Sequence, residues 1–64
     1  MNYLKNYGIN ESMLQEIKSA NVDSFNDLDT YEFTIKENLD YLISLGFTNI
    51  YLLLMYKMNI VLEK

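Results

Sequence analysis

The side chains that could carry chemistry in this 64-residue chain are mostly carboxylates, because the sequence contains neither histidine nor cysteine. Their absence excludes disulfides, cysteine-histidine zinc sites, thiol nucleophiles and imidazole bases. Serine, lysine and carboxylate side chains would have to form any catalytic site, and nothing in their spacing singles one out. The sequence therefore predicts a protein that is not an enzyme and needs no cofactor.

The acidic residues are densest from Asp23 to Glu32, a stretch that also holds Asp27 and Asp29 and no basic residue. A calcium loop would need a glycine at its sharp turn and a bidentate glutamate at a fixed spacing, and neither is present here. We expect these carboxylates to solvate a loop and to favour the N-terminal ends of neighbouring helices. No metal site is predicted.

The basic residues are five lysines, opposed by nine acidic residues, and the formal net charge is −4. Binding to duplex nucleic acid is driven by phosphate neutralisation from a basic face. The lysines are scattered along the chain, at positions 5, 18, 36, 57 and 64. This charge pattern argues against nucleic acid as the ligand.

Length and composition predict one domain, residues 1–64, and half of the residues are apolar, which favours folding over disorder. We expect a cytoplasmic protein without a membrane partner, because no signal-peptide pattern opens the sequence and its most apolar run, residues 50–62, is too short for a span of about 20 residues. Abundant asparagine, isoleucine, lysine and tyrosine, with no arginine, indicate the AT-rich coding of a low-GC bacterium or its mobile elements.

The elements that would position a site form a near repeat with an offset of 38 residues, 3–22 and 41–60. Five of twenty positions are identical, against about one or two expected by chance. The identical pairs are Tyr3/Tyr41, Leu4/Leu42, Gly8/Gly46, Leu14/Leu52 and Asn21/Asn59. Each copy has the pattern of two helices, so we expect an all-α fold. Its two related helical hairpins would be joined by a short helix or turn, as in a small helical-repeat-like bundle.

Glycines and capping residues predict where the helices begin and end. Gly8 and Gly46 each follow an amphipathic segment and precede an apolar residue, which is typical of a left-handed helix end. Asn10 and Thr48 are N-cap types that would start helices over 11–20 and 49–58. Asn21 and Asn59 are expected to stop those helices in the left-handed conformation. Phe25, in the linker, is expected to point inward.

The helix before Gly46 has a predicted start of its own. Thr34 and Glu37 have the spacing of a capping box, which predicts a first helical residue at Ile35. In the linker before it, Leu28 should point inward beside Phe25, three residues away.

The second helix of the C-terminal copy is apolar on nearly every side. Its core stripe is predicted from positions that are apolar in both copies, which are Tyr51, Leu52, Met55 and Met58. Ile50, Leu53 and Leu54 replace the polar Ser12, Gln15 and Glu16 of the first copy and form a surplus face. The predicted interface consists of this face together with Met58, so its residues are Ile50, Leu53, Leu54 and Met58. The alternative is that this helix is the central core helix of a small domain.

The C-terminal copy resembles the repeat of the mitochondrial transcription termination factor (mTERF) family. The resemblance rests on Asn38-Leu39-x-x-Leu42-x-x-Leu45-Gly46-Phe47 followed by Ile50, Leu53 and Leu54. The N-terminal copy resembles the same unit through Tyr3-Leu4-x-x-Tyr7-Gly8-Ile9, with Leu14 and Ile17. The resemblance implies stacked helical hairpins, and the family's basic surfaces imply nucleic-acid binding.

A second resemblance covers the C-terminal third of the chain. Leu42-Ile43-Ser44-Leu45-Gly46-Phe47, with Asn59-Ile60-Val61-Leu62 downstream, resembles the Gly-Phe loop of ubiquitin-associated domains. Taken together, the sequence predicts a small non-enzymatic helical module that binds a protein partner or forms a homodimer through its C-terminal helix. The alternatives are an mTERF-like nucleic-acid-binding protein and a protein whose helix 49–58 is purely structural.

Overall fold

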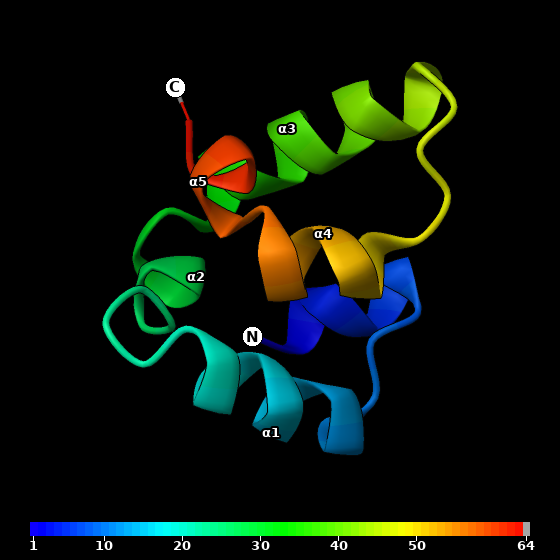
Figure 1. Cartoon of the computed structure of the whole chain (residues 1–64). Coiled ribbons are helices and arrows are strands. Elements are labelled where there is room, and N and C mark those ends of the chain that lie inside the picture. The colour runs from blue at the N-terminus through cyan, green and yellow to red at the C-terminus, as the bar shows by residue number, and fades with distance from the viewer. Residues whose placement is uncertain (64) are drawn as a thin grey trace.

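The computed structural model describes residues 1–63, and this part of the chain contains six helical segments joined by short loops (Figure 1). They are the 3₁₀ helix η1 (Asn2–Tyr7) and the α-helices α1 (Glu11–Ala20), α2 (Asp27–Thr30), α3 (Glu32–Ser44), α4 (Ile50–Tyr56) and α5 (Met58–Val61). No strand occurs over these residues, so the predicted all-α fold is confirmed. No helix in this range has the length and apolar character needed to cross a membrane.

Left-handed glycines follow η1 and α3, as predicted. The backbone angle φ is 83° at Gly8 and 102° at Gly46, values that residues with a side chain rarely adopt. After each helix, the residue following the glycine donates its N–H to the carbonyl five residues earlier, which is a Schellman ending. These bonds are Ile9 N to Leu4 O at 3.2 Å and Phe47 N to Leu42 O at 3.1 Å. The two corners share one backbone geometry, while the duplication itself stays a prediction.

Asparagine side chains cap the N-termini of α1 and α4. The bounds of α1 are those predicted, and Asn10 Oδ1 accepts a hydrogen bond from Met13 N at 2.9 Å. For α4 the predicted cap is wrong, because Asn49 and not Thr48 holds the N-cap position. Asn49 Oδ1 accepts from Leu52 N at 3.1 Å, and α4 begins one residue later than predicted. Asparagine is at least as strong an N-cap as threonine, which explains the choice between these neighbours.

The predicted start of α3 is also wrong. The helix begins at Glu32, three residues before Ile35, and its N-cap Tyr31 makes no side-chain cap bond. Thr34 and Glu37 therefore lie inside the helix and do not form a capping box at its start. Because α2 ends immediately before Tyr31, the chain passes almost directly from one helix to the next.

Neither Asn21 nor Asn59 is left-handed, so both predicted stops are wrong in conformation. Asn21 does follow α1, with φ of −135° and ψ of 53°, and Asn59 lies within α5. The predicted helix 49–58 is instead interrupted at Lys57, where φ is −129°, and this interruption separates α4 from α5.

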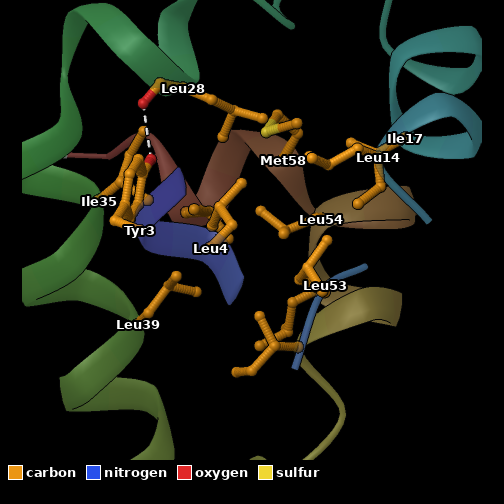
Figure 2. Close-up of a cluster of buried hydrophobic side chains, with 13 residues drawn as sticks. Tyr3, Leu4, Leu14, Ile17, Leu28, Ile35, Leu39, Leu53, Leu54 and Met58 are labelled. Carbon is orange, nitrogen blue, oxygen red and sulfur yellow. Dashed lines mark hydrogen bonds between the residues drawn. The ribbon is translucent and has the colours of Figure 1, made fainter. Parts of the chain in front are cut away.

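The core gathers buried side chains from all six helices around α4 (Figure 2). Both α1 and α5 pack against α4, and α3 packs against α2 and α5. Tyr3 is buried and donates its hydroxyl to the Leu28 carbonyl oxygen at 2.6 Å, which joins η1 to α2. Leu28 is fully buried and Phe25 packs partly buried against the core, so the inward orientation predicted for both is confirmed.

Candidate interaction surface

The four residues predicted to form an interface are core residues. Their exposed fractions lie between 0% and 7%, and they are Ile50, Leu53, Leu54 and Met58. Figure 2 shows Leu54 of α4 beside Leu4 of η1, in the middle of the buried cluster. Burial leaves these four side chains almost no surface for a partner, although Leu53 still lines a groove beside α4. Their assignment to the core, the alternative kept open by the sequence, is the one that the structure supports.

When α4 is aligned with α1 at the 38-residue offset, the alignment indicates which side of α4 should face the core. The structure buries the opposite side. Helix α1 buries Leu14 and Ile17, whose counterparts 38 residues later are Leu52 and Met55. Leu52 is 45% exposed, and Met55 is only partly buried. At 100° per residue, the side that α4 buries with Ile50, Leu53 and Leu54 is about 175° around the helix axis from the side that its alignment with α1 indicates. An apolar stripe on α4 is therefore left at the surface.

Exposed large hydrophobic side chains are concentrated in one half of the chain. Of the ten such residues within positions 1–63, nine lie between Tyr31 and Ile60, and Val22 is the exception. The nine are Tyr31, Phe33, Tyr41, Ile43, Leu45, Phe47, Leu52, Tyr56 and Ile60. Single exposed hydrophobic residues are normal on any protein, whereas a large contiguous apolar patch is typical of an interaction site.

A surface groove of about 450 Å³ lies against the loop between α3 and α4. Its apolar walls include Phe47 from the loop and Leu52 and Tyr56, which are one turn apart on the outer side of α4. The left-handed Gly46 reverses the chain after α3, and the Asn49 cap fixes the start of α4, so the backbone on both sides of Phe47 is held in place. We call this depression the loop groove.

A second, smaller groove of about 220 Å³ lies between α3 and α5 and is lined by Tyr41, Leu42 and Ile60. Asn38 holds this edge together, because its side-chain amide donates to the carbonyl oxygens of Val61, at 2.7 Å, and Glu63. Val61 is the last residue of α5, where a helix lacks internal hydrogen-bond donors, and Glu63 lies two residues beyond the helix. The bonds therefore fix the end of α5 against α3.

The two grooves have no lining residue in common, and each contains one charged side chain, Lys57 in the loop groove and Glu63 in the smaller one. We call six exposed residues the apolar face, and they are Tyr41, Leu45, Phe47, Leu52, Tyr56 and Ile60. All of them except Leu45 line one of the two grooves. Tyr41 on α3 and Leu45, which follows directly after the helix, are four residues apart and lie near the side from which Asn38 reaches α5. Lys57, which lines the loop groove, is the single charged residue from position 41 to position 62.

Three tyrosine hydroxyls are held by hydrogen bonds between distant segments. Burial, followed by the negative charges of Glu32 and Asp29, raises the pKa of Tyr3. Burial and a 2.7 Å hydrogen bond to Asp40 raise the pKa of Tyr7 to about 12. The 2.8 Å hydrogen bond that Tyr51 donates to Glu16 raises the pKa of Tyr51. These hydroxyls remain neutral donors at physiological pH and are therefore poor nucleophiles.

The acidic stretch from Asp23 to Glu32 does not converge on a common point. Asp29 accepts a 2.7 Å bond from the amino group of Met1, and Glu32 lies 3.8 Å from the Lys36 ammonium. Within residues 1–63, no group of three acidic side chains is arranged to hold a metal ion.

Comparison with protein-family models, curated proteins and solved structures finds no match to this chain.

Proposed function

We propose that the chain is a non-enzymatic module that binds another protein through its apolar face, in the cytoplasm. The observation that carries this proposal is that six of the ten exposed large hydrophobic residues belong to the apolar face and that five of these six line a surface groove. Burial of apolar area is the main driving force of protein association. A small domain that leaves so much apolar side-chain area in water gains free energy when a partner covers it.

The composition of the apolar face matches the centre of a protein interface. Three of its six residues are aromatic, and the grooves that five of the six line contain two charged residues, Lys57 and Glu63. Interface centres are enriched in tyrosine, phenylalanine and tryptophan and depleted of charge. Tyrosines anchor interfaces at a small entropy cost, because they have only two side-chain torsions to fix. Tyr56, which is 69% exposed beside the loop groove, is the residue most suited to this role.

The lysines offer less support for nucleic-acid binding, which the mTERF resemblance would imply. Lys36 lies near Glu32, and the Lys18 ammonium lies 6.0 Å from the centre of the Phe25 ring. Lys57 is the one lysine among the residues that line the two grooves, so the grooves offer no row of cations to a phosphate backbone. We therefore favour a protein partner over nucleic acid, and we keep the mTERF resemblance as a proposal about the fold.

The proposal is tested by comparing what matched variants retain from a lysate of the source organism. Leu52→Asp places a charge in the loop groove, and Val22→Asp adds the same charge at an exposed residue outside the apolar face. We expect wild type and Val22→Asp to capture the same proteins, and Leu52→Asp to lose them. Circular dichroism of both variants serves as the control that each of them folds. Equal capture by all three proteins would contradict the proposal.

A further inference from the structure

We infer that residues 58–63, which comprise α5 and the two residues after it, form a hinged strap that opens as one unit while the rest of the described chain stays folded. We call this segment the strap. The inference is independent of the proposed function, because it rests on how α5 is attached to the fold. The attachment consists of a hinge at Lys57, a clamp formed by the side chain of Asn38, and the buried side chains of Met58 and Val61.

The hinge lies between α4 and α5, where the series of helical hydrogen bonds is interrupted. In a continuous helix the N–H of Met58 would donate to the carbonyl oxygen of Leu54, four residues earlier. That oxygen instead accepts the side-chain amide of Asn21. Within residues 1–63, no backbone hydrogen bond runs from Met58 or Asn59 to α4, and Lys57 has the non-helical angles φ of −129° and ψ of 36°. A rotation at Lys57 therefore moves the strap without breaking a hydrogen bond of α4.

One side chain makes every side-chain hydrogen bond between the strap and the rest of the described chain. The amide of Asn38 on α3, beside which α5 lies in Figure 1, donates to the carbonyl oxygens of Val61, at 2.7 Å, and Glu63. The backbone hydrogen bonds of the strap run within it or to the carbonyl oxygen of Lys57, so they move with the strap. The polar attachment of the strap to α3 therefore depends on a single residue.

The strap contributes only a small part of the core. Of the thirteen buried residues of the core cluster, Met58 and Val61 belong to the strap, and Leu62 is partly buried against the cluster. The other eleven lie in residues 3–54 and stay together when the strap opens. Segments with few buried apolar contacts open at a lower free energy than the whole fold. We therefore expect the strap to open before the core formed by the other five helices.

Opening of the strap changes which apolar side chains reach the surface. The strap forms one wall of the smaller groove through Ile60 and Glu63, and α3 forms the other wall. Moving the strap away uncovers Leu42 on the α3 wall and exposes Met58, which is buried in the closed structure. These side chains are covered, fully or in part, while the Asn38 clamp holds. The strap thus controls how much apolar surface the chain presents.

Native-state amide hydrogen exchange, measured by NMR on the full chain, tests the strap without any substitution. The probes are the amides of Val61 and Leu62, whose N–H groups donate to carbonyl oxygens of Lys57 and Met58. The reference is the set of slowest amides of α1 and α3. We expect the probes to exchange through an opening at least about 10-fold more populated than the one that exposes the reference amides. This opening should also depend less on urea, because it exposes less surface than global unfolding.

A matched pair of variants tests the clamp. Asn38→Ala removes both hydrogen bonds to the strap, and Asn6→Ala makes the same change at an exposed asparagine of η1. Relative to the reference amides, Asn38→Ala should raise the open population of the strap by a further factor of about 10, and Asn6→Ala should leave this ratio unchanged. A general loss of stability would accelerate the reference amides as well and would not raise the ratio.

Two results would overturn the inference. One is a wild type whose probes share the opening population and the urea dependence of the reference amides, because the strap would then unfold only together with the core. The other is a ratio in Asn38→Ala equal to that of wild type and Asn6→Ala, because the clamp would then not hold the strap closed. Neither result bears on whether the apolar face binds a partner.

Discussion

The side-chain amide of Asn21 donates a hydrogen bond to the backbone carbonyl oxygen of Leu54 at 3.0 Å, across 33 residues of sequence. The same amide donates to the Ile17 carbonyl oxygen, also at 3.0 Å. Both carbonyls are among the last four of their helices, where helical N–H donors run out, although the Ile17 oxygen also accepts the backbone N–H of Asn21 at 3.0 Å. One carboxamide thus satisfies the C-terminal ends of α1 and α4 together and fixes how these two helices are placed against each other.

Replacing Asn21 with aspartate should therefore destabilise the protein well beyond the effect of a surface mutation. The carboxylate keeps the size of the side chain but cannot donate to either carbonyl, and it adds a negative charge to the negative ends of two helix dipoles. We expect Asn21→Asp to lower the free energy of unfolding by about 2 kcal/mol, measured by urea denaturation at pH 7. Asn59, its counterpart in the predicted repeat, is exposed on α5, so Asn59→Asp should cost less than about 0.5 kcal/mol. Equal losses in the two variants would contradict the role assigned to Asn21.

The two left-handed glycines make a prediction whose sign depends on the chirality of the replacement. A Cβ atom built at Gly8 or Gly46 meets no atom within 4 Å, so only the positive φ opposes a side chain. L-alanine should destabilise the protein by about 1 kcal/mol at either site. D-Alanine favours positive φ, and by restricting the unfolded chain it should stabilise the protein by about 0.5 kcal/mol. Chemical synthesis of the 64-residue chain and thermal unfolding of the four variants provide the measurement. A destabilising D-alanine would show that the corners are not as open as the structure indicates.

Local signals in the sequence predicted the parts of the fold that depend on a few neighbouring residues. Gly8 and Gly46 indicated the two corners, and Asn10 indicated the start of α1. These predictions succeed because a positive φ or a free N-terminal N–H selects the residue type at that position. The failures occurred where distant contacts decide. Asn21 was expected to stop α1 in a left-handed conformation, but bonds to carbonyls of α1 and α4 satisfy its side chain instead.

The apolar face was missed for a related reason. The pattern of α4 is apolar on nearly every side, so its periodicity does not show which side the tertiary structure buries. Comparison with α1 placed Leu52 in the core and Leu54 on the surplus face, and the structure reverses both. The low charge between positions 41 and 62 was a usable signal, because a depletion of charge is typical of buried segments and of interface centres.

The reversal can be checked with two leucines that are two positions apart on α4. Leu54 is 0% exposed, so Leu54→Ala should lower the free energy of unfolding by about 2–5 kcal/mol. A loss of this size is enough to unfold a large fraction of the molecules of a domain this small. Leu52 is 45% exposed, so Leu52→Ala should cost less than about 1 kcal/mol at concentrations where the chain is monomeric. Urea denaturation followed by far-UV circular dichroism measures both. If Leu52→Ala proved the more destabilising of the two, the orientation of α4 would be wrong.

The tyrosine hydroxyls predict a loss of stability at alkaline pH. The folded protein raises the pKa of Tyr7 to about 12, through burial and the hydrogen bond to Asp40, while the unfolded chain titrates near the ordinary value of about 10. A raised pKa means that folding favours the neutral phenol. Its contribution is therefore complete below about pH 10 and is lost as the pH rises toward 12. Tyr3 acts in the same direction, because burial raises its pKa as well.

Substituting phenylalanine separates this ionisation from other alkaline effects. Tyr3→Phe removes the hydroxyl that bonds Leu28 and should cost about 1 kcal/mol at pH 7. It also removes a group that must stay neutral in the fold, so the free energy of unfolding should fall less steeply between pH 9 and pH 11 than it does in wild type. Urea denaturation across this range measures both effects. Parallel pH curves for the two proteins would mean that the buried phenol of Tyr3 does not oppose ionisation, and the alkaline loss would then have to arise from other groups.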